Sequence, residues 1–238
     1  MQGDFGPSFQ YRDYTVTELI ATGFPVSLRL GTAAIFLALI FGSIIGSVAA
    51  LNQNSKLDYS VMFFGMIGIS IPNFVMAPLL VLFFSIGLRA LPAGGYNGGD
   101  FYHMVLPVVS LALPQMAYIA RLTRGSMIEV LSSNFVRTAK AQGLPTRSIL
   151  LKHVLKPTLL PVVSYLGPAT AAIITGSVVV EQIFGLPGLG RYFVQGALNR
   201  DYTLVMGVVV FYGCLIILFN LIVDTLYGFI DPRIKQNR

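Results

Sequence analysis

The 238-residue sequence has few charged residues and a single cysteine. Asp, Glu, Lys and Arg make up 11% of the chain and hydrophobic residues 55%, whereas a soluble domain carries about 25% charge. This scarcity of charge excludes an ordinary soluble domain, and together with long apolar runs it favours an integral membrane protein. The one cysteine, Cys214, lies inside such a run. It cannot form an internal disulfide, and we interpret it as a buried or lipid-facing hydrophobic residue.

The sequence also lacks the motifs of catalytic and energy-converting sites. It contains no Gly-x-x-x-x-Gly-Lys-Ser/Thr phosphate-binding loop, and the glycine-rich stretch Gly185–Tyr192 fits no dinucleotide fingerprint. No set of His, Cys, Asp and Glu has metal-ligand spacing. We therefore predict no cofactor, no metal and no catalytic residues in this chain. The net charge of +6 indicates membrane orientation here, and we predict no nucleic-acid partner.

Five apolar segments are long enough to cross about 30 Å of hydrocarbon. They are Leu30–Leu51, Val61–Leu88, Met104–Leu122, Leu159–Val180 and Leu204–Ile230. Prolines occur inside the second, third and fourth segments, which a membrane helix tolerates when neighbouring helices satisfy the freed carbonyls. Small residues are frequent, as in "GSIIGSVAA" and "GPATAAIITGS", and let helices approach closely. The sequence thus predicts an all-α membrane protein with five packed spans.

The basic residues are distributed unequally between the two sides of these spans. Eleven of the 16 Lys and Arg residues lie in or beside Asn52–Ser60, Thr123–Thr158 and the tail after Ile230, and five lie on the other side. Because basic loops remain in the cytoplasm, this asymmetry places Thr123–Thr158 and the C-terminus there. We expect an extracytoplasmic segment at 1–23, a transmembrane domain at 24–224 with a cytoplasmic loop at about 123–158, and the last span's end and a cytoplasmic tail at 225–238.

The same rule puts the polar segment Met1–Val26 outside, although no span precedes it to carry it across. We interpret this as the absence of a preceding helix from the sequence. The alternative is an N-terminus that inserts unaided.

Ionisable residues within the spans are few. Asp224, with Asn220 one turn before it, is interpreted as a hydrogen-bonded helix-packing residue, and ion coupling is the alternative. Arg29 and Glu181 lie at outer span ends, where we expect them to reach the interface. An intramembrane hydrolase is the rival of a different class.

That hydrolase would need a nucleophile and a base at one depth. The two histidines, His103 and His153, fall on opposite sides of the membrane in this topology. Neither is expected to meet a serine within a span, such as Ser110 or Ser177, so the sequence favours a transport protein over a hydrolase.

The outer connection near the fourth span holds glycines and a proline. We predict a hinge formed by Glu181, Gly185, Pro187, Gly188 and Gly190, followed by a short amphipathic run, Arg191–Leu198. Irregular backbone at membrane depth persists only where protein or a water-filled cavity covers it, so the hinge lines the outer mouth of a pathway in one interpretation. In the other it is a capped helix end and a surface turn.

The cytoplasmic loop is unusually long and amphipathic. Ser133–Gln142 is a helix-forming run with Ser or Asn as its cap, and Gly143 stands at the C′ position, where a left-handed conformation is favoured. Leu144 and Pro145 turn the chain, and Thr146–Leu155 is a second amphipathic helix. This helix, turn and helix fits two roles: an interfacial element on anionic lipid, or a docking element for another protein.

The same stretch resembles the membrane subunits of binding-protein-dependent ATP-binding-cassette importers of the type-I fold. Their cytoplasmic loop reads Glu-Ala-Ala, three residues, Gly, nine residues, Ile-x-Leu-Pro, and the peptide- and nickel-importing subgroup reads "RTA-A-GL" followed by "H-L-P-LLP". The residues of this sequence that match the subgroup's ATPase-coupling loop are Arg137, Thr138, Ala139, Ala141, Gly143, Leu144, Arg147, Leu155 and Pro157. "GDFGPSF", "ARLTRGSMIEVL", "EQIFGLPGLG", "ALNRDY" and "DPR" support the same subgroup, and the chain resembles its oligopeptide-importing B-type subunits most.

The resemblance implies a pathway subunit of an oligopeptide importer in the bacterial inner membrane. It implies a second permease subunit as a heterodimer partner, two ATP-binding subunits that hold ATP and Mg²⁺, and an extracytoplasmic peptide-binding protein. The loop around Gly143 would then be the coupling helix that fits a groove of one ATPase. Dipeptide, glutathione and nickel importers have similar subunits and are the alternatives. Subunits of this subgroup usually have six spans, so the resemblance implies that the expected missing helix is the first of them.

Overall fold

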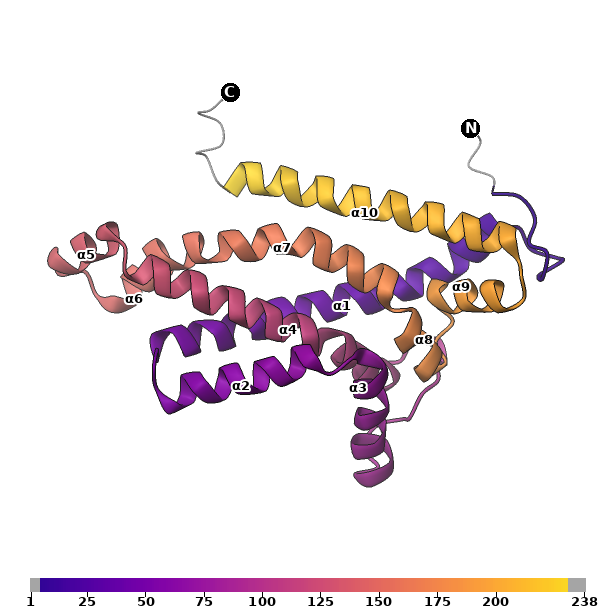
Figure 1. Ribbon diagram of the computed structural model, residues 1–238, viewed down its shortest axis with the longest axis horizontal. Coiled ribbons are helices and arrows are strands. Elements are labelled where there is room, and N and C mark those ends of the chain that lie inside the picture. The colour runs from indigo at the N-terminus through magenta and orange to yellow at the C-terminus, as the bar shows by residue number, and fades with distance from the viewer. Residues whose placement is uncertain (1–4, 231–238) are drawn as a thin grey trace. The chain divides into compact units, whose positions relative to one another are not determined.

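The structure is a computed structural model that describes residues 5–230, and its chain folds into helices joined by short connections (Figure 1). Within these residues, β pairing is limited to an isolated bridge between Pro7 and Thr15. Segments η1 and η3 are π-helical and η2 is a 3₁₀ turn. In chain order the elements are α1 (Val16–Leu51), α2 (Lys56–Ser70), α3 (Asn73–Leu80), η1 (Val81–Gly87), η2 (Asn97–Gly99), α4 (Phe101–Leu131), α5 (Asn134–Ala141), α6 (Thr146–Ser148), η3 (Ile149–Val154), α7 (Leu155–Gly176), α8 (Val178–Phe184), α9 (Leu189–Leu198) and α10 (Tyr202–Ile230).

Four helices of the described chain are long and apolar enough to cross a membrane: α1, α4, the helix from Thr146 to Thr175 that runs through α6, η3 and α7, and α10. The pair Lys56–Ser70 and Asn73–Gly87 passes the same test together and gives a fifth crossing if it is counted as one. The predicted all-α membrane fold is confirmed, and the five predicted spans correspond to these four helices and the broken pair.

The second predicted span, Val61–Leu88, is not one continuous helix. It breaks at Ile71 and Pro72, between α2 and α3. Pro72 lacks an N–H and disfavours a helical conformation for the residue before it, and its own backbone is extended with φ −62° and ψ 148°. Proline therefore ends the helix here, although the apolar composition continues without interruption.

Helix α1 begins at Val16, well before the predicted first span, so the expected boundary between residues 23 and 24 lies inside a helix. A reciprocal capping interaction determines this start. The Glu18 N–H donates to Thr15 Oγ1 at 3.2 Å, and the Thr15 N–H donates to Glu18 Oε2 at 2.8 Å. This capping box satisfies two backbone donors of the first turn, a local signal that hydropathy alone does not detect.

The predicted cytoplasmic loop at about 123–158 is mostly helix and is continuous with the flanking spans. Helix α4 extends to Leu131, and from Thr146 the chain is helical through η3 into α7. The π-helical segment lies just before Pro157, which has no N–H for the carbonyl of His153. The second amphipathic helix is therefore the beginning of a long membrane helix and not a separate element.

The chain divides into two compact units, and helices α1, α4, α7 and α10 each contribute to both. The first unit comprises Met1–Ile35, Ile71–Ala112 and Thr170–Phe219. Its core joins the first turns of α1 to α7, α9 and α10, and Phe24 and Phe211 pack edge to face with their ring centroids 5.0 Å apart. The buried residues of this core are Val16, Leu19, Ile20, Ile174, Leu189, Leu204, Val208, Tyr212 and Leu215.

The second unit comprises Phe36–Ser70, Leu113–Ala169 and Asn220–Arg238. Within it α1 approaches α4 so closely that a Cβ atom at Gly42 would lie 2.7 Å from the Met116 carbonyl oxygen. This contact confirms that the small residues of "GSIIGSVAA" allow close helix packing. At the α5 end the core contains Ala50, Met127, Val136, Ala139, Ile149 and Val154.

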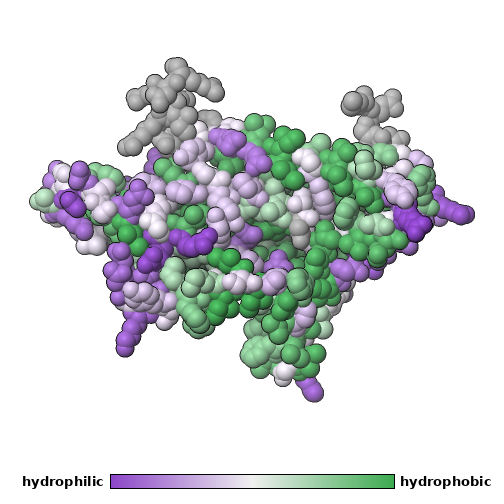
Figure 2. All heavy atoms as spheres, viewed as in Figure 1, coloured by the Kyte–Doolittle hydropathy of each residue, from purple (hydrophilic) through white to green (hydrophobic). Residues whose placement is uncertain are grey.

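Large apolar side chains remain exposed along the membrane helices, as Figure 2 shows by the extent of hydrophobic surface. Phe64 of α2 is 69% exposed, and Ile217 and Leu221 of α10 are 70% and 61% exposed. Such surfaces suit lipid or another membrane subunit, because lipid tails are as apolar as these side chains. Tail residues 231–238, which include "DPR", lie outside the described residues, as do Gly3 and Asp4 of "GDFGPSF".

Candidate functional site

The first candidate site is the turn between α5 and α6. Helix α5 begins after Ser133, whose backbone is extended and whose hydroxyl donates to the Val130 carbonyl at 2.6 Å and not to the helix. The helix ends at Ala141, and Gly143 has φ +77°. The Leu144 N–H then donates to the Ala139 carbonyl at 3.3 Å. The predicted helix and its glycine termination are confirmed to within a residue.

One face of α5 is fixed to the rest of the second unit. Val136 and Ala139 are buried against Ile149 and Val154 of η3 and against Met127 of α4. The position of α5 therefore depends on α4 and on the start of the long α6–η3–α7 helix. A force applied to α5 would be transmitted to these two helices through packed side chains.

The opposite face of α5 and the turn are exposed. Phe135 is 49% exposed and Leu144 is 38% exposed, so apolar side chains stand among basic ones. Of the predicted coupling residues, Ala139 is buried and Pro157 is half-buried, and neither offers its side chain freely to a partner. The predicted coupling residues that are exposed are Arg137, Thr138, Ala141, Gly143, Leu144, Arg147 and Leu155.

An ion pair next to this element was not predicted. Asp58 of α2 is buried, and its carboxylate accepts two hydrogen bonds from Arg124 of α4, at 2.5 Å from Nε and 2.7 Å from Nη2. The Asn54 N–H donates to the same carboxylate at 3.0 Å. The two residues are 66 positions apart, so no local sequence pattern indicates the pair. Bidentate pairing restrains both orientation and distance, so this pair ties the α1–α2 turn to α4.

The second candidate site surrounds Glu181 in the first unit. This side chain is fully buried within the protein, which corrects the expectation that it extends from a span end to the interface. Its Oε1 accepts hydrogen bonds from the hydroxyls of Ser27 and Ser177, each at 2.6 Å. Its Oε2 accepts from the N–H groups of Gly190 at 2.8 Å and Arg191 at 3.3 Å. The first turn of α9 thus binds a buried carboxylate, in keeping with the affinity of helix N-termini for anions.

The predicted hinge residues gather around this carboxylate. Gly188 and Gly190 lie against Glu181, and a Cβ atom at Gly190 would be 2.5 Å from the Val178 Cα. Gly185 ends α8 in a left-handed conformation with φ +67°, while Pro187 is half-buried. Ser27 also accepts the Leu189 N–H at 2.9 Å. The structure therefore shows a junction of α1, α8 and α9 that is linked by hydrogen bonds, where the sequence predicted a hinge.

A second buried carboxylate, Asp201, holds the outer segment before α1. It accepts hydrogen bonds from the hydroxyls of Ser8 at 2.5 Å and Thr203 at 2.9 Å and from the N–H groups of Gln10 and Leu204 at 3.1 Å. Burial alone would raise the pKa of Asp201, but these hydrogen bonds outweigh burial and lower the pKa to about 2. The group is therefore anionic at physiological pH.

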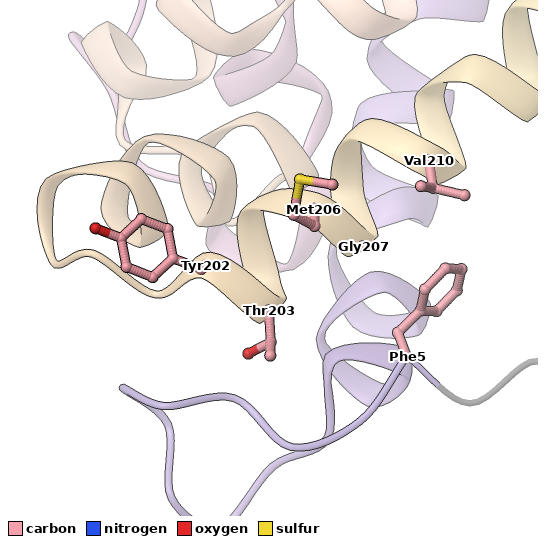
Figure 3. Close-up of a pocket in the computed structure, with 6 residues that line it drawn as sticks. All are labelled: Phe5, Tyr202, Thr203, Met206, Gly207 and Val210. Atoms are coloured by element: carbon pink, nitrogen blue, oxygen red, sulfur yellow. The ribbon is translucent and has the colours of Figure 1, made fainter.

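A shallow apolar depression of about 320 Å³ lies beside this segment (Figure 3). Phe5 lines it from the N-terminal segment, and the remaining lining residues come from the first turns of α10. They are Tyr202, Thr203, Met206, Gly207 and Val210. These side chains offer packing surface but no acid, base or nucleophile.

The remaining titratable residues form no catalytic group. His103 lies 3.2 Å from Asp100, one turn earlier on the surface. Ser177 donates to Glu181, and Ser110 has no hydrogen-bond partner within residues 5–230, so neither serine meets an imidazole there. No group of three or more His, Cys, Asp and Glu in that range could hold a metal ion. Asp224 is exposed and has no described hydrogen bond, contrary to the packing interpretation.

Comparisons with known proteins agree with the helical fold. Residues 42–236 match the family described as "Binding-protein-dependent transport system inner membrane component". Oligopeptide transport system permease protein OppB of Escherichia coli K12 is 61% identical over 98% of this chain and 76% of its own length, and OppB of Haemophilus influenzae is 58% identical over the same shares. Dipeptide transport system permease protein DppB of Bacillus subtilis is 47% identical over 99% of this chain and 76% of its own.

Among solved structures, the inward-facing MetNI methionine ABC transporter matches with a TM-score of 0.77 at 19% identity, covering 90% of this chain and 96% of the other. A structure described as an amino acid ABC transporter with histidines matches with a TM-score of 0.66 at 16% identity, covering 89% of this chain and 94% of the other. At these identities the matches establish the fold, which is that of type-I importer membrane subunits.

Proposed function

This chain belongs to the family of inner membrane components of binding-protein-dependent transport systems, and from this membership we propose that it is the pathway subunit of an ATP-driven oligopeptide importer. The observation that carries the proposal is the 58–61% identity to oligopeptide permease proteins along 98% of the chain. At this identity the chain retains the fold of those proteins.

A dipeptide importer is the second candidate, because a dipeptide permease protein is 47% identical along nearly the same length. The lower identity ranks it behind the oligopeptide function. Both functions require the same fold and the same partner classes, so uptake of peptides of different length separates them.

ATP hydrolysis belongs to partner subunits in this proposal, since the 238 residues contain no phosphate-binding loop. The exposed face of α5 and the turn at Gly143 would dock in a groove of an ATPase subunit. Phe135 and Leu144 would enter an apolar part of that groove, while Arg137 and Arg147 would meet acidic groups at its rim. Movement of the ATPases would reach α4 and α7 through the buried face of α5.

The remaining partners follow from the same assignment. A second permease subunit would complete the pathway, and an extracytoplasmic binding protein would deliver the peptide. The excess of basic residues near α5 supports a cytoplasmic location of that element and of the C-terminus in this proposal. The α8–α9 junction then faces the side from which peptide arrives.

Deletion of the gene in the organism that carries it tests the function. We expect loss of uptake of radiolabelled tri- to pentapeptides, with restoration by a plasmid copy of the chain. Dipeptide uptake should persist through other systems. Unchanged oligopeptide uptake in the deletion strain would refute the proposal, and selective loss of dipeptide uptake would replace it with the second candidate.

The coupling role is tested at Gly143. A Cβ atom there meets nothing within 4 Å, so Gly143→Val introduces backbone strain of about 1–2 kcal/mol without a steric clash. We expect peptide uptake to fall and ATPase subunits to co-purify less well, while the amount of the chain in the membrane is unchanged. Gly143→Asn is the matched control, because Asn tolerates the left-handed conformation and should retain most uptake.

A lipid-surface role for α5 predicts the reverse order of effects. Charge reversal at Arg147 would then impair the protein more than Gly143→Val, and ATPase association would be independent of Gly143. Cysteines at Ala141 and Leu144, both exposed, provide a direct measurement. Failure of both to cross-link to an ATPase subunit, in a complex shown to be assembled, would exclude the docking role.

A further inference from the structure

Three polar side chains form a stripe on α4 inside its apolar stretch. Gln115, Tyr118 and Arg121 are spaced by three residues, which places them on one face of the helix. Gln115 and Tyr118 are half-buried and Arg121 is exposed. All three lie within Met104–Leu122, the segment whose composition predicted a membrane span. Ionisable and amide groups at such depth mark substrate pathways in membrane proteins.

These side chains are organised by one residue of α7, Tyr165. Its hydroxyl donates to Gln115 Oε1 at 2.5 Å, and its ring stacks on Tyr118 with a centroid distance of 4.3 Å and an interplanar angle of 26°. The Arg121 Cζ lies 4.9 Å above the Tyr118 ring. We name these four residues, Gln115, Tyr118, Arg121 and Tyr165, the α4–α7 polar surface.

The Arg121 guanidinium lies over the Tyr118 ring, almost one turn back toward the middle of α4, which is the direction in which helical side chains lean. Within residues 5–230 it has no carboxylate partner. An unpaired charge held in this position requires water or a polar partner that arrives from outside the chain.

The amide of Gln115 is also free to bind. Its Nε2 has two N–H donors and no hydrogen-bond partner among residues 5–230, because only Oε1 is engaged. Lipid hydrocarbon offers a partner neither to this amide nor to the Arg121 guanidinium, so this side of α4 faces something polar.

We infer that the α4–α7 polar surface contacts the peptide during translocation, an inference that rests on the proposed function. A peptide supplies the complementary chemistry. Its backbone carbonyls accept hydrogen bonds from the Gln115 amide, its side chains pack on the two tyrosine rings, and its terminal carboxylate pairs with Arg121. None of these contacts depends on a particular sequence, which suits a pathway that passes many peptides.

The inference is tested by placing the photo-reactive residue p-benzoylphenylalanine at position 118 in the complete importer, where it replaces one aromatic ring with another. Position 116 is the matched control, since Met116 lies on the α4 face that approaches α1. The probe is a radiolabelled tripeptide delivered by the binding protein to the illuminated importer with ATP. We expect labelled peptide on this chain from position 118 and at least tenfold less from position 116.

A second measurement addresses Arg121. Uptake rates of a tripeptide with a free C-terminal carboxylate and with a C-terminal amide are compared at saturating binding protein. Arg121→Gln should lower the acid-to-amide rate ratio about fivefold relative to the wild type, and Arg121→Lys should retain it. The comparison between variants removes any preference of the binding protein itself.

The outcomes separate this inference from the function on which it rests. Wild-type uptake of the tripeptide with no peptide cross-link at position 118 and an unchanged rate ratio in Arg121→Gln would overturn the inference and leave the function standing. Cross-links from position 118 only to lipid or to the second permease would overturn it as well. A wild-type importer that takes up no tripeptide would refute both the inference and the proposed function.

Discussion

Replacement of Ser27 by alanine should release the start of α9 from α1. Ser27 is fully buried, and its hydroxyl both donates to Glu181 Oε1 at 2.6 Å and accepts the Leu189 N–H at 2.9 Å. The alanine removes a hydrogen bond to a charged acceptor, which contributes about 1.5–3 kcal/mol, and leaves a buried N–H unsatisfied at a cost of about 1–3 kcal/mol. Because these two effects overlap in part, we expect the free energy of local opening of α9 to fall by about 2–5 kcal/mol.

Ser177→Ala is the matched control. Its hydroxyl donates to the same oxygen of Glu181 at the same distance, 2.6 Å, but within residues 5–230 it accepts no hydrogen bond from a backbone N–H. The substitution therefore removes one charged hydrogen bond and leaves no donor of α9 unsatisfied. We expect Ser27→Ala to destabilise the start of α9 more than Ser177→Ala does, although both serines donate to the same Glu181 carboxylate.

Hydrogen exchange measured by mass spectrometry on the amides of Leu189–Leu198 provides the assay. If α9 opens locally, a loss of 2–5 kcal/mol corresponds to exchange that is roughly 30-fold to 4,000-fold faster in Ser27→Ala. Amides of α5, in the other unit, serve as the internal reference and should be unchanged. Equal exchange of α9 in the wild type and Ser27→Ala would refute the reasoning, because the Leu189 N–H would then not depend on Ser27.

Three further predictions concern other parts of the chain. Asp58→Ala should destabilise the detergent-solubilised protein by about 1.5–3 kcal/mol, because Arg124, whose side chain is 25% exposed, loses its hydrogen bonds to a charged partner, whereas Asp58→Ala with Arg124→Leu should recover part of the loss in the thermal unfolding temperature. The pKa of Asp201 is lowered from 3.8 to about 2, so its stabilisation is complete above pH 3.8 and is lost as the pH falls toward 2; the decline in unfolding temperature over this range should be smaller in Asp201→Asn, which keeps only the contributions of the other carboxylates. A cysteine at Gln142, with Cys214 replaced, should react with an impermeant maleimide only after permeabilisation of the cells, and labelling of intact cells would contradict the orientation.

Local features of the fold could be predicted from the sequence. The turn at Gly143 was predicted because a glycine after a helix-forming run reports a left-handed C′ residue, and both signals lie within ten residues. The spans were found because their apolar composition is continuous. Pro72 was a signal for the break between α2 and α3, but the continuous hydropathy of Val61–Leu88 led to the prediction of one unbroken span.

The hydrogen-bonded side chains around Glu181 and the Asp58–Arg124 ion pair could not be predicted in the same way, because the residues that meet are far apart in the chain. Ser27 and Glu181 are separated by 154 positions, and Asp58 and Arg124 by 66. A serine inside an apolar run has no distinctive pattern, and an acidic residue near a span end resembles an interfacial one. Only the packing of α1 against α8 and α9 reveals that Glu181 is enclosed by donors.

Uptake into proteoliposomes tests the central claim most directly. The chain would be purified with its second permease and ATPase subunits, reconstituted into lipid vesicles with ATP inside, and supplied outside with the binding protein and a labelled tripeptide. The proposed function predicts that labelled peptide accumulates inside against its gradient, that accumulation requires both ATP and this chain, and that it persists when ion gradients are dissipated. Accumulation that occurs without ATP, or with ATP in vesicles that lack this chain, would contradict the account.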